Sequence, residues 1–196
     1  MMRAIIAMVA VLALSGCAFT VHDVKLDYRY EQPLEVSLGG TALRVGNVVD
    51  SRGVANPRML MNMTNLNGDT TSGGWQAEKP LNEIVREGLV QALGKAGVAA
   101  DGGSGAAMLT GELIDFQVQT IMGMWEGTLS GKMTAKFQIA RAGSGEILWK
   151  DTVVGSSQVK GGQGAAGAFK ATLDDLLTKL LKDDFFRQKV ATAPSM

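Results

Sequence analysis

The chain has 196 residues, enough for one domain with a substantial core, and its 19 basic and 19 acidic side chains balance. This balance gives no electrostatic reason to expect nucleic acid as a partner. With only one cysteine, Cys17, and one histidine, His22, the chain lacks the residues for an internal disulfide or for a zinc site of three or four nitrogen and sulfur ligands. We therefore expect no metal and no cofactor.

The N-terminal stretch has the pattern of a secretory signal peptide. Met1-Met2-Arg3 supplies a positive charge, and residues 4–14 are apolar. That run is shorter than the 20 or so residues that a membrane-spanning helix needs. The pattern predicts a signal peptide over residues 1–16, with cleavage between Gly16 and Cys17.

The end of this segment, Leu14-Ser15-Gly16-Cys17, resembles the lipobox of bacterial lipoproteins. The resemblance implies that Cys17 carries diacylglycerol, becomes the first mature residue and is then N-acylated. Two or more acyl chains hold a protein stably on a membrane. Ala18, in place of an aspartate, favours delivery to the outer membrane in a host that has one. A plain signal peptide or an uncleaved anchor is the alternative.

The sequence then predicts a short lipidated tether over residues 17–23, which includes His22, and a single domain over residues 24–190. Apolar and charged side chains alternate over residues 24–30, which predicts a half-buried strand. The apolar residues 42–49 predict a core strand that ends at Asp50-Ser51-Arg52. Asp50 and Arg52 are spaced to form a structural ion pair that pins the next segment.

Residues 53–79 lack periodicity and are rich in Gly, Asn and Thr, which predicts a long loop. Apolar side chains within this loop are candidates for an adaptable partner-binding surface, because methionine fits irregular partners. The alternative is a loop folded over one edge of the core, with the same side chains buried. The candidates are Met59, Leu60, Met61, Met63 and Trp75.

The remaining elements have clearer patterns. Pro80 precedes an apolar stripe that predicts a helix from residue 81 to Gly94 or Gly97. Residues 108–119 change apolar phase, which predicts a strand with a bulge. Residues 125–139 alternate strictly, and Ala142 to Gly145 predict a hairpin turn into a strand at 147–153 whose buried face includes Ile147.

After a flexible link at 161–167, an apolar stripe from Phe169 to Phe185 predicts a final helix, and residues 191–196 a frayed tail. The predicted fold class is α+β, in the order β-α-β-β-β-α. It is a two-layer sandwich in which an antiparallel sheet of about four to five strands carries two helices on one face.

The side chains available for catalysis are few. His22 lies only five residues from the predicted lipid anchor and is interpreted as a tether residue, so no serine–histidine or cysteine–histidine pair is expected. A hydrolase based on two carboxylates would need both acids to face one cleft at about 5–9.5 Å. The candidate acids on predicted strands are Glu112, Asp115, Glu126 and Asp151.

With these residues in hand, the chain resembles the YajG-like family of bacterial lipoproteins. The resemblance rests on the lipobox, on the strand ending at Asp50 to Arg52, on the helix at residues 81–93, on the three-strand meander and on the final helix with Asp184-Phe185-Phe186. It implies an α/β periplasmic domain on a lipid anchor, similar in layout to auxiliary lipoproteins of envelope transport and assembly machines. It implies no catalytic residues.

The sequence therefore predicts a lipoprotein on the periplasmic face of the outer membrane that acts as a protein-interaction module of an envelope complex and not as an enzyme. One alternative is a carrier of an apolar ligand such as lipid, held in a pocket lined by Phe137, Trp149 and Leu177. The other is the carboxylate hydrolase, acting on cell-wall glycan.

Overall fold

The computed structural model describes residues 20–35, 37–39, 43–64, 69–100, 107–122 and 127–192. The predicted signal peptide, Gly16 and Cys17 lie outside these ranges, as do residues 193–196 of the predicted tail. None of the helices within the described ranges is long and apolar enough to cross a membrane.

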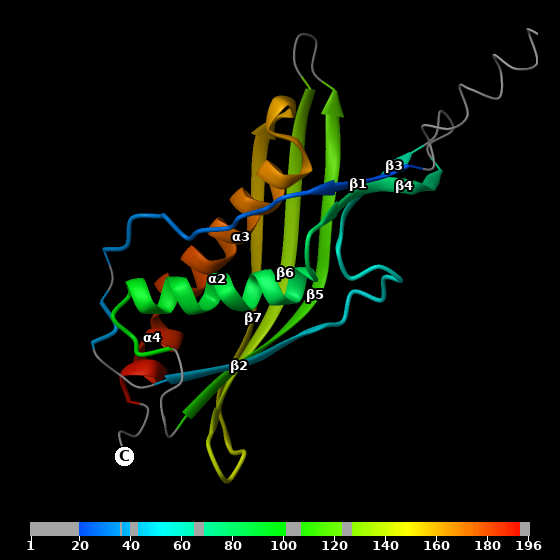
Figure 1. The fold of residues 1–196 in the computed structure, drawn as a ribbon. Coiled ribbons are helices and arrows are strands. Elements are labelled where there is room, and N and C mark those ends of the chain that lie inside the picture. Colours follow the sequence, from blue (N-terminus) through cyan, green and yellow to red (C-terminus); the bar gives the residue numbers. More distant parts are fainter. Residues whose placement is uncertain are drawn as a thin grey trace, which may run out of the picture.

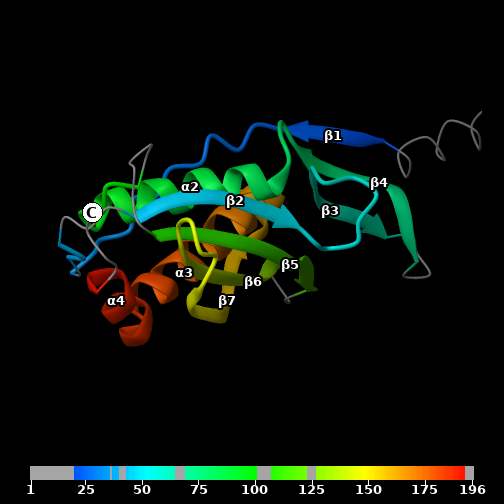
Figure 2. The ribbon, with the colours of Figure 1, turned by 90° about the horizontal axis from the view of Figure 1, so that it is seen from below.

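Four strands form the main sheet, in the order β2-β5-β6-β7, and three form a smaller sheet beside it, in the order β1-β4-β3 (Figures 1 and 2). The main-sheet strands are β2 (Leu43–Asp50), β5 (Ala107–Met122), β6 (Gly127–Arg141) and β7 (Ile147–Lys160). The small-sheet strands are β1 (Val21–Val24), β3 (Met59–Thr64) and β4 (Thr70–Ala77). The α+β class is confirmed.

The main sheet is mixed, so the prediction of a purely antiparallel sheet is wrong at one pair. β2 pairs with β5 in parallel, whereas β5, β6 and β7 form an antiparallel meander. The chain between β2 and β5 contains a hairpin and a helix, and a connection of this length allows two neighbouring strands to run in the same direction.

Two details of the meander follow from residue patterns. The predicted phase change in β5 is a bulge, because the register with β6 shifts between Leu113 and Asp115. The register of β6 with β7 also shifts, between Ile139 and Ala140. This second shift was not predicted, and beyond it Ile147 is half exposed and does not continue the buried face.

The predicted long loop over residues 53–79 is wrong for most of its length, because β3 and β4 form an antiparallel hairpin there. Glycines usually weaken a strand, but Gly74 allows the two strands to approach closely. A Cβ atom at position 74 would lie 2.2 Å from the carbonyl oxygen of Met61. Gly74, one of the glycines that suggested a loop, is therefore required for the close pairing of β3 and β4.

The first predicted stripe forms α2 (Leu81–Lys95), whereas the second is divided between α3 (Gly164–Lys182) and α4 (Asp184–Ala191). α2 and α3 lie on the same face of the main sheet, as predicted (Figure 1). Gly97, with φ of 85°, adopts a left-handed conformation just beyond α2 and ends it. The predicted link at 161–167 is instead a short 3-10 turn, Gly161–Gln163, followed by the first turn of α3.

The last helix is not continuous, and this changes which phenylalanine is buried. Asp183 has an extended backbone, and its Oδ1 accepts a hydrogen bond from the backbone N–H of Phe186 at 2.6 Å, which caps α4. The break shifts the helical phase. As a result, Phe185 is 72% exposed and Phe186 is fully buried, so the prediction that Phe185 belongs to the apolar stripe is wrong.

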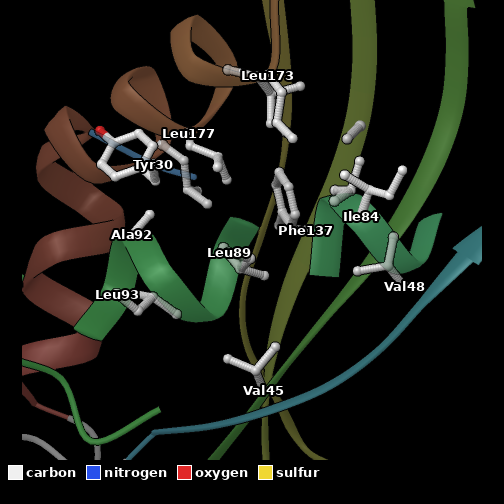
Figure 3. Close-up of a cluster of buried hydrophobic side chains, with 14 of the residues drawn as sticks. Tyr30, Val45, Val48, Ile84, Leu89, Ala92, Leu93, Phe137, Leu173 and Leu177 are labelled. Atoms are coloured by element: carbon white, nitrogen blue, oxygen red, sulfur yellow. The ribbon is translucent and has the colours of Figure 1, made fainter. Parts of the chain in front are cut away.

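The core lies between the main sheet and the two helices. Phe137 projects from β6 toward Leu173 and Leu177 of α3 and toward α2 (Figure 3), and all three named side chains are fully buried. The helix α3 packs directly on β6 and β7 because Gly131 and Gly155 leave space there: a Cβ atom at Gly155 would lie 2.4 Å from the carbonyl oxygen of Thr172.

Residues 25–35 form an extended strap over the helices rather than the predicted strand over residues 24–30 (Figure 1). Their alternation is real, since Leu26, Tyr28 and Tyr30 are buried. Side chains replace the missing sheet ladder: Gln91 of α2 accepts a hydrogen bond from the N–H of Tyr30 and donates one to the carbonyl of Tyr28. Alternation alone cannot distinguish packing on helices from packing in a sheet.

The strap is fastened to α3 by two tyrosine hydroxyls, and we expect Tyr28→Phe to cost more stability than Tyr30→Phe. Tyr28 donates to the carboxylate of Asp174 at 2.7 Å, whereas the hydroxyl of Tyr30 shares a 2.9 Å hydrogen bond with that of Thr178. Hydrogen bonds to charged groups contribute about 1.5–3 kcal/mol and neutral ones about 1 kcal/mol. Urea unfolding of both variants measures the difference, and equal losses would contradict this ranking.

Candidate functional site

Arg52 fixes the segment between the two sheets. Its guanidinium donates to Asp50 twice, from Nε to Oδ1 at 2.9 Å and from Nη2 to Oδ2 at 2.7 Å. It also donates to the carbonyls of Pro57 at 2.7 Å and Met59 at 3.1 Å. The Arg52 side chain is only 3% exposed. The predicted ion pair is thus present, and it fixes the start of β3 relative to the end of β2.

The electrostatics of this pair favour the charged form of the carboxyl group. The hydrogen bonds from Arg52 hold the pKa of Asp50 below its usual range, against the opposing effect of partial burial. The guanidinium of Arg52 contacts Asp50 and the carbonyls of Pro57 and Met59, so it positions the start of the hairpin relative to the end of β2.

An apolar groove lies between the small sheet and the start of α3. Its volume is about 360 Å³, and Val24, Met61, Trp75 and Leu129 line it together with residues of the turn at 161–166. No charged side chain is among the lining residues. Four segments far apart in sequence therefore form one surface.

The groove includes two of the five predicted partner-binding residues. Met61 of β3 and Trp75 of β4 are partners across the hairpin, and both are half-buried. Leu60 points the other way and is 3% exposed, so it belongs to the core. Met59 lines a second cavity of about 280 Å³ beside β5, which Leu60 and Met61 also line, and Met63 lies further along the hairpin.

Neighbouring side chains hold this face of the small sheet in place. The ring of His22 lies against that of Trp75, with the ring centroids 6.2 Å apart. Arg58 pairs with Asp23 of β1 and donates to the carbonyl of Ala77 at 2.7 Å. The strands that carry Met61 and Trp75 are therefore held together by the contacts of Arg58. His22 packs beside the ring of Trp75.

Among the described candidate carboxylates, the depression on the open face of the main sheet is lined by only one. The bulge in β5 places Glu112 and Asp115 on the same open face of the main sheet, and Asp151 pairs with Phe137, which faces the helices. A depression of about 430 Å³ on the open face is lined by Glu112 and Lys136, and Asp115 does not line it. Glu126 lies outside the described residues. Within the described ranges, no three His, Cys, Asp or Glu residues cluster to hold a metal ion.

The apolar-ligand pocket predicted at Phe137, Trp149 and Leu177 is filled. Phe137 and Leu177 are fully buried members of the contiguous core, and Trp149 packs edge-on against Phe186 with the ring centroids 5.1 Å apart. A core in which large side chains interdigitate leaves no room for a lipid there. The prediction of this location is wrong.

Both edges of the main sheet are engaged by helix side chains. On β2, Arg86 donates to the carbonyl of Gly46 at 3.0 Å and Asn82 to that of Val48 at 2.9 Å. On β7, the N–H of Ser156 donates to Asp175 at 2.7 Å. Such cover discourages the addition of a further strand. The small sheet and the groove beside it are therefore the better candidates for contact with a partner.

Sequence reasoning missed half of the groove. Val24 was assigned to a strand, Leu129 to the core and residues 161–166 to a flexible link, and no local pattern indicates that these segments meet. The sequence feature that indicated part of the groove is the presence of a tryptophan and several methionines in a polar segment. This feature identified Met61 and Trp75.

Comparisons with known proteins identify the fold. The chain matches no family model, and a search of curated proteins finds no match. Among solved structures, protein XCC0632 from Xanthomonas campestris, of family DUF330, is similar with a TM-score of 0.62 and 15% identity, over 86% of this chain and 97% of that one. This similarity shows that the two chains share a fold.

Two further solved structures match less well. Protein CT253 from Chlamydia trachomatis has a TM-score of 0.47 and 6% identity, over 79% of this chain and 98% of its own. A minor lipoprotein from Acinetobacter baumannii has a TM-score of 0.43 and 13% identity, over 73% of this chain and 91% of its own. The YajG-like resemblance stays a prediction.

Proposed function

We propose that this protein is a lipoprotein anchored through Cys17 on the periplasmic face of the outer membrane, and that it acts by binding a protein partner. The lipobox at residues 14–17 supports the anchor, and Ala18 supports the outer membrane. The YajG-like resemblance supports a role as an auxiliary module of an envelope assembly or transport complex. Among the described residues, no three His, Cys, Asp or Glu side chains cluster to hold a metal ion. Of the described candidate acids, only Glu112 lines the depression on the open face of the main sheet. The proposal therefore invokes no catalytic step.

The observation that carries the proposal is the groove with Met61 and Trp75. The side chains of Met61 and Trp75 pack partly against the core but are only half-buried, so part of each remains accessible to a partner. Tryptophan is enriched among residues that dominate binding energy at protein interfaces, and methionine adapts to irregular apolar surfaces. A volume of about 360 Å³ lies at the lower end of the range for small-molecule sites and suits a few apolar side chains of a partner.

Site-specific photocrosslinking in membranes tests this proposal. A photoreactive residue at Met61 is expected to give an adduct with a specific protein, whereas the same residue at Lys136, on the open face of the main sheet, is expected to give none. A lipid adduct at Met61 would favour the apolar-ligand carrier instead. The absence of any adduct at Met61 would contradict the interaction module.

Removing the indole is expected to weaken that contact. Truncating an interface tryptophan typically costs 2 kcal/mol or more, which corresponds to a roughly 30-fold loss of affinity. We therefore expect Trp75→Ala to abolish most of the Met61 adduct. Trp149→Phe is the control, because Trp149 packs on Phe186 and does not line the groove, and it should leave the adduct intact.

A further inference from the structure

The chain between the predicted anchor and the fold is short. Only residues 18–20 separate Cys17 from Val21, the first residue of β1. β1 is fixed against β4 in a parallel ladder from Val21 to Val24. An extended chain spans at most about 3.6 Å per residue, so Val24 lies within about 25 Å of Cys17.

The groove is at the end of the molecule from which this tether leaves. Val24 lines it directly, and the small sheet lies on the opposite side of the structure from α4 (Figure 1). The main sheet extends from the groove far away from the tether. From Leu129, which lines the groove, to Arg141 at the other end of β6 is 12 residues, or about 40 Å of strand.

From the tether length and the position of the groove, we infer that the partner segment is an apolar stretch of an integral membrane protein, close to the surface of the same membrane that holds Cys17. This inference rests on the proposed function and specifies its partner. The groove carries no charged lining residue, so an apolar segment complements it. Because the tether keeps the groove near the membrane, a segment that emerges from that membrane meets it at high effective concentration.

Lengthening the tether tests the inference. Twenty Gly and Ser residues are inserted between Phe19 and Thr20 of the full chain, and photocrosslinking from position 61 is repeated in membranes. The carbonyl of Thr20 accepts a hydrogen bond from the N–H of Gly74 at 3.1 Å, so the tether before it is residues 18–19. The insertion lengthens this tether from 2 to about 22 residues. The effective concentration of the partner segment at the groove falls as about the −3/2 power of tether length, which predicts a roughly 35-fold decrease. The same insertion after Thr192 is the matched control, because it leaves the tether unchanged.

The expected result is at least a five-fold loss of the protein adduct with the lengthened tether and no loss with the control insertion. An equal yield from both chains would overturn the inference and leave the proposed function standing, since the partner would then reach the groove independently of the membrane. If the unaltered tether gives no protein adduct at Met61, or a lipid adduct, both the proposed function and the inference fail.

Discussion

Replacing Arg52 by alanine is expected to lower the free energy of unfolding by about 3–5 kcal/mol. The substitution leaves the Asp50 carboxylate without its partner and removes the donors to the carbonyls of Pro57 and Met59. Removing one member of a buried ion pair typically costs this much, because the other charge stays uncompensated. It is a large part of the 5–15 kcal/mol that stabilises an ordinary domain.

Urea unfolding of the detergent-solubilised mature protein, followed by tryptophan fluorescence, measures this loss. Arg141→Ala is the matched control, because Arg141 forms an exposed ion pair with Glu146. Exposed pairs contribute about 0–1 kcal/mol. Arg52→Lys should recover only part of the stability, since an ammonium group cannot reproduce the two-pronged contact. Equal effects of the alanine substitutions at 52 and 141 would contradict the structural role of Arg52.

The same pair makes a pH-dependent contribution. Hydrogen bonds from Arg52 hold the pKa of Asp50 below its usual value, so the folded state binds the proton less tightly than the unfolded state. The contribution is therefore present above the ordinary aspartate pKa of about 3.9 and is lost as the pH falls through the lower, folded-state pKa. We expect the stability difference between the parent chain and Arg52→Ala to narrow from pH 7 to pH 3. An unchanged difference would contradict this account of the pair.

Gly155→Val is expected to destabilise the fold by about 3 kcal/mol, through a different mechanism. A Cβ atom at position 155 would lie 2.4 Å from the carbonyl oxygen of Thr172 and 2.6 Å from the Cβ of Leu176. These atoms belong to α3 and cannot rotate away, so the whole helix must shift. Overpacking a well-filled core costs about 1–3 kcal/mol, and a branched side chain against backbone lies at the upper end.

Gly94→Ala is the matched control for this substitution. Gly94 lies within α2, and a Cβ atom there would have no neighbour within 4 Å. Alanine in a helix is favoured over glycine by about 1 kcal/mol, so this variant should be slightly more stable than the parent chain. If Gly155→Val unfolds at the same urea concentration as the parent chain, α3 does not sit as closely on the sheet as the structure shows.

Local patterns predict the elements of the main body because those elements are regular. In each of α2, β5 and β6, the spacing of the apolar residues shows which face of the element packs on the core. The buried phenylalanine of the last helix was assigned wrongly because Asp183 breaks the helical phase, and an Asp-Asp-Phe-Phe sequence does not reveal where the break falls.

The small sheet was not predicted because its pairing depends on contacts between separate segments, which the pattern of one segment does not show. β4 contains Gly73 and Gly74, which the sequence presents as loop residues, yet Gly74 is required by the close approach of β3. The strap over the helices was read as a strand because its side chains alternate, although Gln91 and Lys95 supply its backbone partners. Such long-range requirements appear only when the segments are brought together.

The groove was anticipated only in part for the same reason. Met61 and Trp75 are conspicuous in a polar segment, but Val24, Leu129 and the turn at 161–166 join them from three other parts of the chain. Predicting their meeting requires the packing of the small sheet against α3, and that packing depends on the Arg52 contacts that fix β3.

The lipid anchor at Cys17 is the claim on which both the proposed function and the position of the groove depend. The most direct measurement is the intact mass of the mature protein isolated from membranes, together with the mass of its N-terminal peptide. We expect the mature chain to begin at Cys17 and to carry a diacylglyceryl group and an N-linked acyl chain. A chain that begins elsewhere, or an unmodified Cys17, would contradict it.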